Sequence, residues 1–295
     1  MVAVGLFGRP KRLGVALGSG SARGLAHIGV LKALEAAGLA PEVVTGTSMG
    51  AVVGAMYAAG KRPEELEAIA TSYDVKSLLS LADVALQRGA VMAGDKVEAF
   101  LAEHLPERFE DLRLPFGCAS TDLTTGHGVK HTAGDLRRAV RASLSIPVIF
   151  APVTGDGHVL VDGFLTDPVP VALARQLGAE VVVAVDVCGS GTVVADGGDQ
   201  DAGLVRDLIA VLRGEPRQRR RGTSGLEVLS ASVEIMERHV AQNALASADV
   251  VISPDVHGFP GYDFVSAADI VAAGERAGRA AAKAVARKAK RQAAG

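Results

Sequence analysis

The chain has 295 residues, of which 48% are hydrophobic and 22% charged, a balance that excludes a disordered chain and is typical of a protein with a packed core. Its formal net charge of −2 lacks the excess of lysine and arginine that a dedicated nucleic-acid-binding protein uses to neutralise phosphates. The two cysteines, Cys118 and Cys188, lie in apparent strands, and we recognise no signal peptide or membrane-spanning segment. We therefore expect a cytoplasmic protein with buried free thiols.

Short apolar segments alternate with amphipathic segments along the chain. Strands are expected at residues 12–18, 41–46, 115–121, 158–163, 179–187 and 248–256. Helices are expected at residues 25–38, 49–60, 63–73, 96–105, 135–145, 226–246 and 269–292. Because strands and helices alternate, the pattern predicts an α/β fold with a mostly parallel sheet covered by helices on both faces.

No internal repeat or domain linker interrupts this pattern, so we expect one domain over residues 12–274, with its motif-bearing core at 13–190. A flexible tail is expected at residues 1–11 and a basic C-terminal helix or tail at residues 275–295. Polar loops are expected at about 189–203 and 213–225. The apolar segment 75–94 is interpreted either as a lid or acyl-chain channel or as a buried packing helix.

A glycine-rich loop, GSGSARG at residues 18–24, follows the first expected strand and precedes a helix. Such a loop usually binds an anion through its backbone amides. The spacing of Gly18, Gly20 and Gly24 is one residue too wide for a dinucleotide fingerprint, and no acidic residue ends the second strand. We therefore expect the amides of Gly20 and Ser21 to stabilise a transient oxyanion.

The sequence GTSMG, residues 46–50, lies between the second expected strand and a helix. This context is that of a nucleophile elbow, in which Ser48 projects from a sharp turn and Gly46 and Gly50 allow the strand and helix to approach. The helix N-terminus favours negative charge on the serine oxygen. The alternative is an ordinary strand-to-helix turn in which Ser48 is only the N-cap.

Two residues are candidates for the base that would accept the proton of Ser48. His257 follows the last expected strand, as the histidine of a serine–acid–histidine triad would. Asp162, followed by Gly163, ends another strand, and a partly desolvated carboxylate there could accept the proton instead. Each has an ordinary explanation as well, a surface-loop histidine and a solvated Asp-Gly turn.

The ordered motifs resemble those of the patatin-like phospholipases, particularly small bacterial members related to the catalytic domain of neuropathy target esterase. The resemblance lies in residues 18–38, in GTSMG, in TDLTTG at 121–126, and in SLSIPVIFAPV and VDGFLTDPVPV at 143–153 and 161–171. It implies a three-layer α/β/α fold and a Ser–Asp dyad without a catalytic histidine.

The resemblance also implies a role for each matching residue. Ser48 is implied to be the nucleophile and Asp162 the base, while the amides of Gly20 and Ser21 form the oxyanion hole. Supporting positions in the same motifs are Gly18, Arg23, Gly24, Gly46, Gly50 and Gly163. The implied activity is hydrolysis of carboxylic esters of phospholipids, lysophospholipids or neutral lipids through an acyl-enzyme, with no metal or organic cofactor.

Three residues depart from the family pattern, namely Ser19 and Ser21 in place of glycine and Phe164 in place of glycine or alanine. They keep open a low-turnover binding or regulatory protein on the same fold, and an acyltransferase would share every residue named above. Basic stretches at 217–221 and 286–292 suggest peripheral contact with an anionic membrane, although solvated charge runs are the commoner explanation. Substrate headgroup, chain length and oligomeric state are left open by the sequence.

Overall fold

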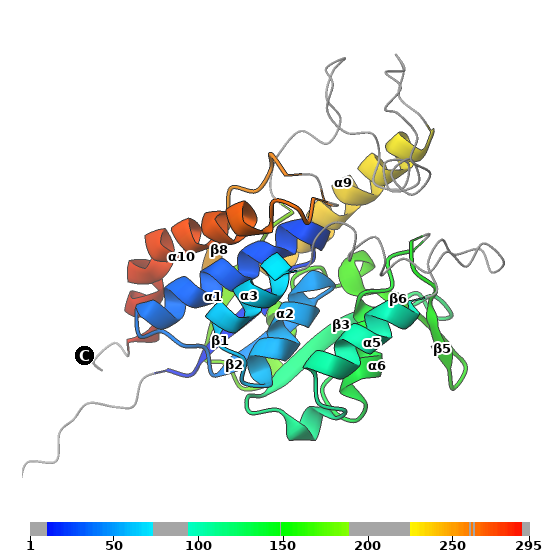
Figure 1. Ribbon diagram of the computed structural model, residues 1–295, viewed down its shortest axis with the longest axis horizontal. Coiled ribbons are helices and arrows are strands. Elements are labelled where there is room, and N and C mark those ends of the chain that lie inside the picture. Colours follow the sequence, from blue (N-terminus) through cyan, green and yellow to red (C-terminus); the bar gives the residue numbers. More distant parts are fainter. Residues whose placement is uncertain are drawn as a thin grey trace, which may run out of the picture.

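The computed structural model describes residues 11–72, 94–147, 149–188, 225–259, 261 and 263–290. In this part of the chain, helices lie on both faces of an eight-stranded sheet, which confirms the expected three-layer α/β/α fold (Figure 1). The expected lid at 75–94, the two polar loops and the basic stretch 217–221 fall almost entirely outside the described residues, as does most of the N-terminal tail.

The sheet has a parallel half and an antiparallel half. Its strands are β1 (Leu13–Leu17), β2 (Val43–Thr47), β3 (Phe116–Asp122), β4 (His127–His131), β5 (Val153–Gly155), β6 (His158–Asp162), β7 (Val181–Val185) and β8 (Val250–Ile252). Strands β8, β7, β1, β2 and β3 are parallel neighbours in that order, whereas β4 and β6 pair antiparallel with β3, and β5 with β6. Strands β4 and β5 were not expected, because their residues are mostly exposed or half-buried and lack an apolar alternation.

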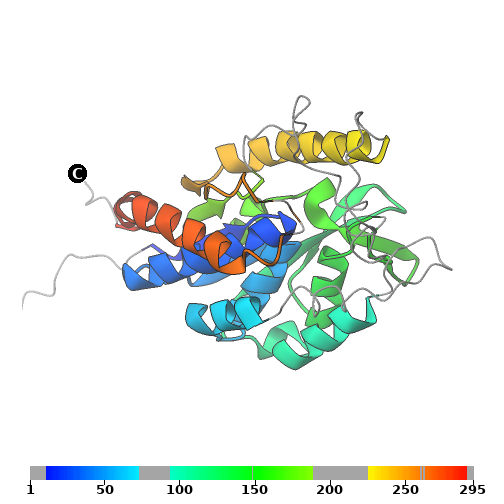
Figure 2. The same cartoon turned by 45° about the horizontal axis from the view of Figure 1, so that its top comes forward.

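The helices are α1 (Ala26–Ala36), α2 (Met49–Ala58), α3 (Pro63–Ser72), α5 (Asp95–His104), α6 (Leu136–Ser143), α7 (Val171–Gln176), α9 (Gly225–Ala246) and α10 (Ala267–Ala289). Short 3-10 turns η1 (Ser21–Leu25), η2 (Phe109–Asp111) and η3 (Gly163–Leu165) complete the described elements. Figure 2 shows α9 on one side of the sheet and α1, α2, α3 and α10 on the other.

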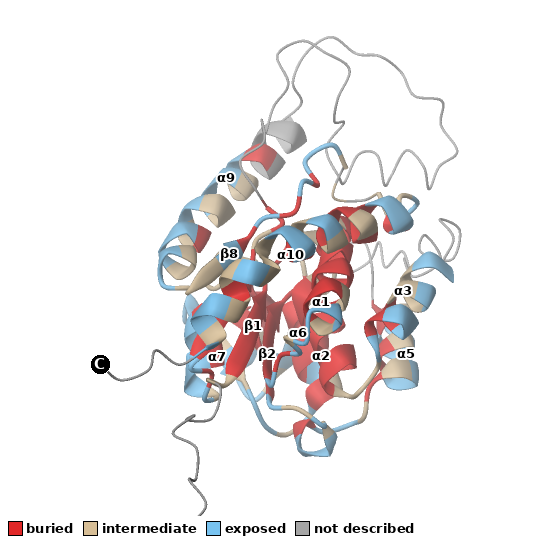
Figure 3. Ribbon diagram, turned by 90° about the vertical axis from the view of Figure 1, so that its left-hand side faces the viewer, coloured by how far each residue is buried: buried red, intermediate tan, exposed pale blue. Residues whose placement is uncertain are grey.

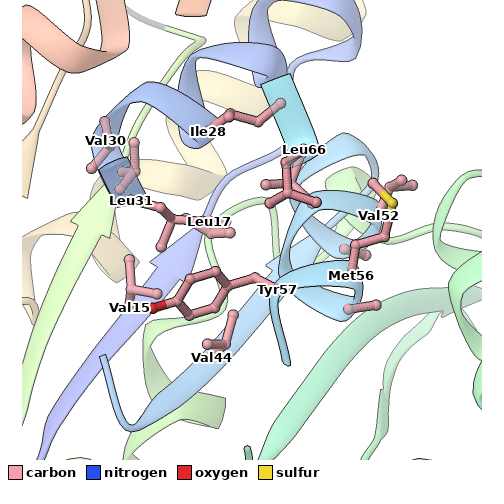
Figure 4. Packing of buried hydrophobic residues seen from close by; sticks show 14 of the residues in the cluster. Val15, Leu17, Ile28, Val30, Leu31, Val44, Val52, Met56, Tyr57 and Leu66 are labelled. Carbon is pink, nitrogen blue, oxygen red and sulfur yellow. The ribbon is translucent and has the colours of Figure 1, made fainter. Parts of the chain in front are cut away.

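Two apolar clusters occupy the two faces of the sheet. In β1, Val15 and Leu17 belong to the larger cluster, which includes side chains of α1, α2 and α10, whereas Ala16 belongs to the smaller one with α7 and α9. Successive side chains of a strand point to opposite faces, so a fully buried β1 needs helices on both sides (Figure 3). Figure 4 shows Val15 and Leu17 packed among residues of α1 and α2 such as Leu31 and Tyr57.

One edge of β3 is shared by two strands, and this arrangement positions the site. Residues 118–119 pair with both β2 and β4, so these two strands lie on opposite edges of β3. Residues 120–122 pair with both β4 and β6, so β6 lies on the same edge as β2. Thr47 is opposite Ala119 and Asp162 is opposite Ser120, which places the end of β2 and the end of β6 at successive positions of one edge.

Helix α10 crosses residue 274, the expected end of the domain, and packs along α1. The contact is between backbones, because a Cβ added to Gly274 would lie 1.9 Å from the carbonyl oxygen of Ala26. The far end of α10 meets the start of β1, where the Lys11 amide donates to the Ala289 carbonyl at 3.2 Å. The division of the chain into a domain and two terminal segments stays a prediction.

The two cysteines are free and buried, as expected. Within the described ranges, no helix combines the length and the hydropathy that crossing a bilayer requires.

We expect Gly274→Ala to lower the free energy of unfolding by about 1–3 kcal/mol, because the added methyl group forces the backbones of α1 and α10 apart. This loss exceeds the gain of up to about 1 kcal/mol that alanine brings to a helix interior. Chemical denaturation measures the free energy of unfolding of the variant. Gly258→Ala is the control, since nothing lies within 4 Å of a Cβ there. Equal stability of the two variants would contradict the close backbone contact.

Candidate active site

Ser48 lies on a strained turn between β2 and α2. Its backbone angles are φ 55° and ψ −123°, a region that residues with a side chain rarely adopt. The Ser48 amide donates to Ser143 Oγ at 2.9 Å, and Ser48 is only 3% exposed. A Cβ added to Gly46 would lie 2.2 Å from the carbonyl oxygen of Gly50, so Gly46 allows the turn to be this tight. A Cβ added to Gly50 would lie 2.2 Å from the carbonyl oxygen of Leu17, so Gly50 allows the elbow helix to approach β1. This geometry is that of the expected nucleophile elbow.

Asp162 ends β6 in a fully buried position at the same edge of the sheet. Its amide donates to the Ser145 carbonyl at 2.9 Å, and its Oδ1 accepts from the Phe164 amide at 3.0 Å. Its Oδ2 is buried and finds no hydrogen-bond partner among the described residues. One carboxylate oxygen is therefore held by the backbone, and the other has a free lone pair.

Burial raises the pKa of Asp162 to about 8, and the charge of Glu237 adds to this rise, while the nearby Ser48 hydroxyl and the amides of Phe164 and Gly163 partly oppose it. The ends of β2 and β6 lie at successive positions of one edge of β3, so the side chains of Ser48 and Asp162 are neighbours. A carboxylate with such a pKa is a much stronger base than an exposed aspartate. The structure thus brings together Ser48 and Asp162, the two residues expected to exchange a proton.

The glycine-rich loop is bound at several points but leaves two amides free. Ser19 and Ala22 donate their amides to the carbonyl oxygens of Pro168 and Gly261, at 2.9 and 2.8 Å. Between them, the amides of Gly20 and Ser21 have no acceptor among the described residues. Gly20 has φ +158°, and a Cβ there would lie 2.4 Å from Val187 Cγ2, so the position requires glycine. Ser21 adopts φ 51° although it carries a side chain.

Hydrogen bonds tie the loop, the elbow strand and the segment after Asp162 into one unit. Thr45 and Thr47 of β2 donate their hydroxyls to the carbonyl oxygens of Pro170 and Asp167, at 2.9 and 2.7 Å. The Ser19 amide reaches the same segment through Pro168. The three motifs that carry the site are therefore linked directly to one another, as well as through the sheet.

The remaining glycines of the motifs lie at close contacts between these segments. A Cβ on Gly24 would lie 2.6 Å from Met49 Cβ, so the glycine-rich loop packs directly on the elbow helix. A Cβ on Gly163 would lie 2.4 Å from the Ala119 carbonyl, and one on Gly18 would lie 2.9 Å from the Val185 carbonyl. Arg23 donates from Nε to the Phe259 carbonyl at 2.7 Å and forms an ion pair with Glu234 at 3.2 Å.

Two histidines, His257 and His27, lie in environments that differ from that of a catalytic base. His257 is exposed, whereas Ser48 is buried, and the structure does not bring the two together. His27 is fully buried, and burial lowers its pKa to about 4, so it is neutral and its Nε2 donates to the Gly18 carbonyl at 2.7 Å. His27 and Ser143 thus support the loop and the elbow. Sequence reasoning missed both, since a helical histidine and a serine in SLSIP carry no distinctive pattern.

Among the described residues, no group of three or more histidine, cysteine, aspartate or glutamate side chains is placed to hold a metal ion. The chemistry that these residues can support is nucleophilic. It combines a serine on a helix N-terminus, a strongly basic carboxylate and two free backbone amides.

Comparisons with known proteins point to one family. Residues 15–175 match the family described as patatin-like phospholipase. An uncharacterised NTE family protein of Mycobacterium tuberculosis is 36% identical over 229 residues, which cover 77% of this chain and 61% of that protein. The chain therefore spans about three fifths of the length of this relative.

Two further relatives are much longer than this chain. A patatin-like phospholipase domain-containing protein of Caenorhabditis elegans is 36% identical over 200 residues, or 65% of this chain and 15% of that protein. The lysophospholipase NTE1 of Coccidioides immitis is 35% identical over 185 residues, or 60% of this chain and 12% of that protein.

The raised pKa of Asp162 predicts a pH-dependent effect of Asp162→Asn on stability. The folded protein keeps the Asp162 proton up to about pH 8, whereas the unfolded chain releases it near 3.8, so the wild type loses stability as the pH rises between these values. Asparagine does not titrate, so the unfolding temperature of the variant should rise relative to wild type across this interval and level off above it.

Thermal unfolding at a series of pH values checks this, with Asp255→Asn on the exposed loop after β8 as the matched control. A difference between Asp162→Asn and wild type that stays constant over the interval would contradict the raised pKa.

Proposed function

The chain belongs to the patatin-like phospholipase family, and we propose that it is a serine lipid acyl hydrolase that cleaves carboxylic esters through a Ser48–Asp162 dyad. The observation that carries the proposal is the pairing of a strained, buried Ser48 with a buried carboxyl whose pKa is raised to about 8. Sequence position alone does not produce such a pair; it depends on two strands ending side by side on one edge of β3.

In the first half of the reaction, Ser48 Oγ attacks the ester carbonyl carbon while its proton passes to Asp162. The Oδ2 atom is the acceptor, since Oδ1 already accepts from the Phe164 amide. The amides of Gly20 and Ser21 stabilise the negative charge that develops on the carbonyl oxygen. The intermediate then collapses to an acyl-enzyme, and the departing alcohol takes the proton from Asp162.

In the second half, a water molecule attacks the acyl-enzyme and gives a proton to Asp162. Collapse of this second intermediate releases the fatty acid, and the proton returns to Ser48 Oγ. The dyad needs Asp162 in its ionised form at the start of each half, so the rate rises as the pH increases toward about 8. No metal ion or organic cofactor takes part in these steps.

The proposed substrates are phospholipids, lysophospholipids or neutral lipid esters. Support comes from the family and from the lysophospholipase name of one relative that is 35% identical over 185 residues. Transfer of the acyl group to an acceptor other than water uses the same residues. The departures Ser21 and Phe164 remove no backbone donor, because the Ser21 amide is still present in the oxyanion loop and the Phe164 amide donates to Asp162 Oδ1.

We expect Ser48→Ala and Asp162→Asn each to lower the turnover of a short-chain p-nitrophenyl ester by about a thousandfold or more, since each removes a partner in proton transfer. His257→Ala should keep wild-type activity, because its side chain is exposed. The assay is run above pH 8, where most Asp162 is ionised.

Loss of activity in His257→Ala with survival in Asp162→Asn would contradict the dyad and indicate a histidine-based triad. Absence of turnover in the folded wild type, with lipid esters as well, would favour the alternative of a binding or regulatory protein. Release of an acyl group only when an alcohol acceptor is supplied would identify an acyltransferase.

We place the enzyme in the cytoplasm, a proposal that the free Cys118 and Cys188 support, with peripheral contact to an anionic membrane. The described basic side chains at the end of α10 are exposed, but this end lies beside Lys11, at the edge of the sheet where β1 begins. Ser48 follows the opposite ends of the strands. A membrane bound by the end of α10 would therefore recruit the enzyme without facing its site.

Replacing Arg287, Lys288 and Lys290 together by glutamine should reduce co-sedimentation with phosphatidylserine liposomes at low salt, because each basic charge near such a surface contributes about 1 kcal/mol. Turnover of the soluble ester should not change. Equal co-sedimentation of the variant and the wild type would contradict a role for this end of α10.

A further inference from the structure

Helix α9 contributes an acidic side chain to the oxyanion loop, although it is far from that loop in sequence. The half-buried carboxylate of Glu237 accepts a hydrogen bond from the hydroxyl of Ser19 through Oε1. The same Oε1 lies 3.1 Å from the thiol sulfur of Cys188, just after β7. Three separate segments of the chain therefore meet at one carboxylate oxygen.

The thiol of Cys188 also reaches the backbone of the loop. Its sulfur lies 3.2 Å from the carbonyl oxygen of Ser19, so its single hydrogen is shared between this oxygen and Glu237. Burial raises the pKa of the thiol well above its ordinary value, so the hydrogen is present to be donated.

The carbonyl of Ser19 and the amide of Gly20 belong to the same peptide group. In a trans peptide the C=O and N–H bonds are coplanar and point in opposite directions, and the described residues contain no cis peptide. Holding the Ser19 oxygen on the side of Cys188 and α9 therefore fixes the direction of the Gly20 N–H on the other side. Gly20 is one of the two free amides of the loop.

We propose that Glu237, Ser19 and Cys188 form a clamp, here called the α9 clamp, that sets the orientation of the Gly20 amide for the reaction at Ser48. Glu237 and Cys188 are positioning residues in this clamp, since neither touches the reacting atoms. The inference rests on the proposed function.

The α9 clamp also accounts for Ser19, which departs from the glycine of the family. Ser19 is 2% exposed, and its hydroxyl donates to Glu237, with the Pro168 carbonyl at 3.3 Å as a second acceptor. One turn earlier on α9, Glu234 bonds Arg23 at 3.2 Å and Arg238 at 2.7 Å. Helix α9 thus holds the loop on both sides of the free amides, and a serine at position 19 adds a contact.

The test compares Glu237→Ala with Glu237→Gln, using kcat and KM for a short-chain p-nitrophenyl ester. Glu237→Ala should lower kcat about 10- to 100-fold with KM changed by less than about threefold, because a misdirected oxyanion donor weakens the transition state selectively. Glu237→Gln keeps an acceptor oxygen in place and should retain kcat within about threefold. Gln242→Ala, exposed on the same helix, is the matched control and should match the wild type.

Two further measurements separate positioning from general loss of structure. The affinity of a trifluoromethyl ketone, which mimics the oxyanion, should fall in Glu237→Ala in parallel with kcat and recover in Glu237→Gln. Labelling with iodoacetamide, assigned by peptide mass mapping, should show Cys188 reacting faster in Glu237→Ala than in the wild type while Cys118 stays protected.

Wild-type kcat and analogue affinity in Glu237→Ala would overturn the α9 clamp and leave the proposed function intact. Equal losses in Glu237→Ala and Glu237→Gln, with Cys188 still protected in both, would also overturn it. A wild type no more active than Ser48→Ala in the same assay would instead overturn the proposed function, and the catalytic role of the clamp with it.

Discussion

The architecture of the site depends on the shared edge of β3. Strand β2 pairs in parallel with that edge as far as Ala119, and β6 pairs antiparallel with the same edge from Ser120 onward. Where β2 leaves the sheet, its chain must turn sharply, and Ser48 occupies that turn. Where β6 ends, Asp162 is buried against the same place. The strain on one residue and the desolvation of the other therefore have a common origin in strand pairing.

Much of the fold could be predicted from sequence because its rules are local. The apolar β1 and β7 alternate between two clusters, and the elbow and glycine-rich loop occur where a parallel sheet places strand ends. Strand β4 was missed because it has no apolar pattern of its own. It belongs to the sheet because it pairs with β3. His127 and His131 accordingly lie in a strand.

The site was predictable in its residue types and less so in its support. Ser48, Asp162 and the loop glycines carry recognisable motifs, but their proximity depends on strand register. Ser143 and Glu237 act through hydrogen bonds across long sequence separations, and neither has a local pattern that would mark it. A helix glutamate is normally a solvated residue, so only its burial against Ser19 and Cys188 distinguishes Glu237.

The hydrogen bond between Lys11 and Ala289 joins the start of β1 to the end of α10. It brings the beginning and end of the described fold together on the side away from Ser48. A unit whose two ends are adjacent and remote from its reactive face can be grafted into a longer polypeptide without obstructing that face. In two relatives the matching region makes up only 12–15% of a much longer polypeptide.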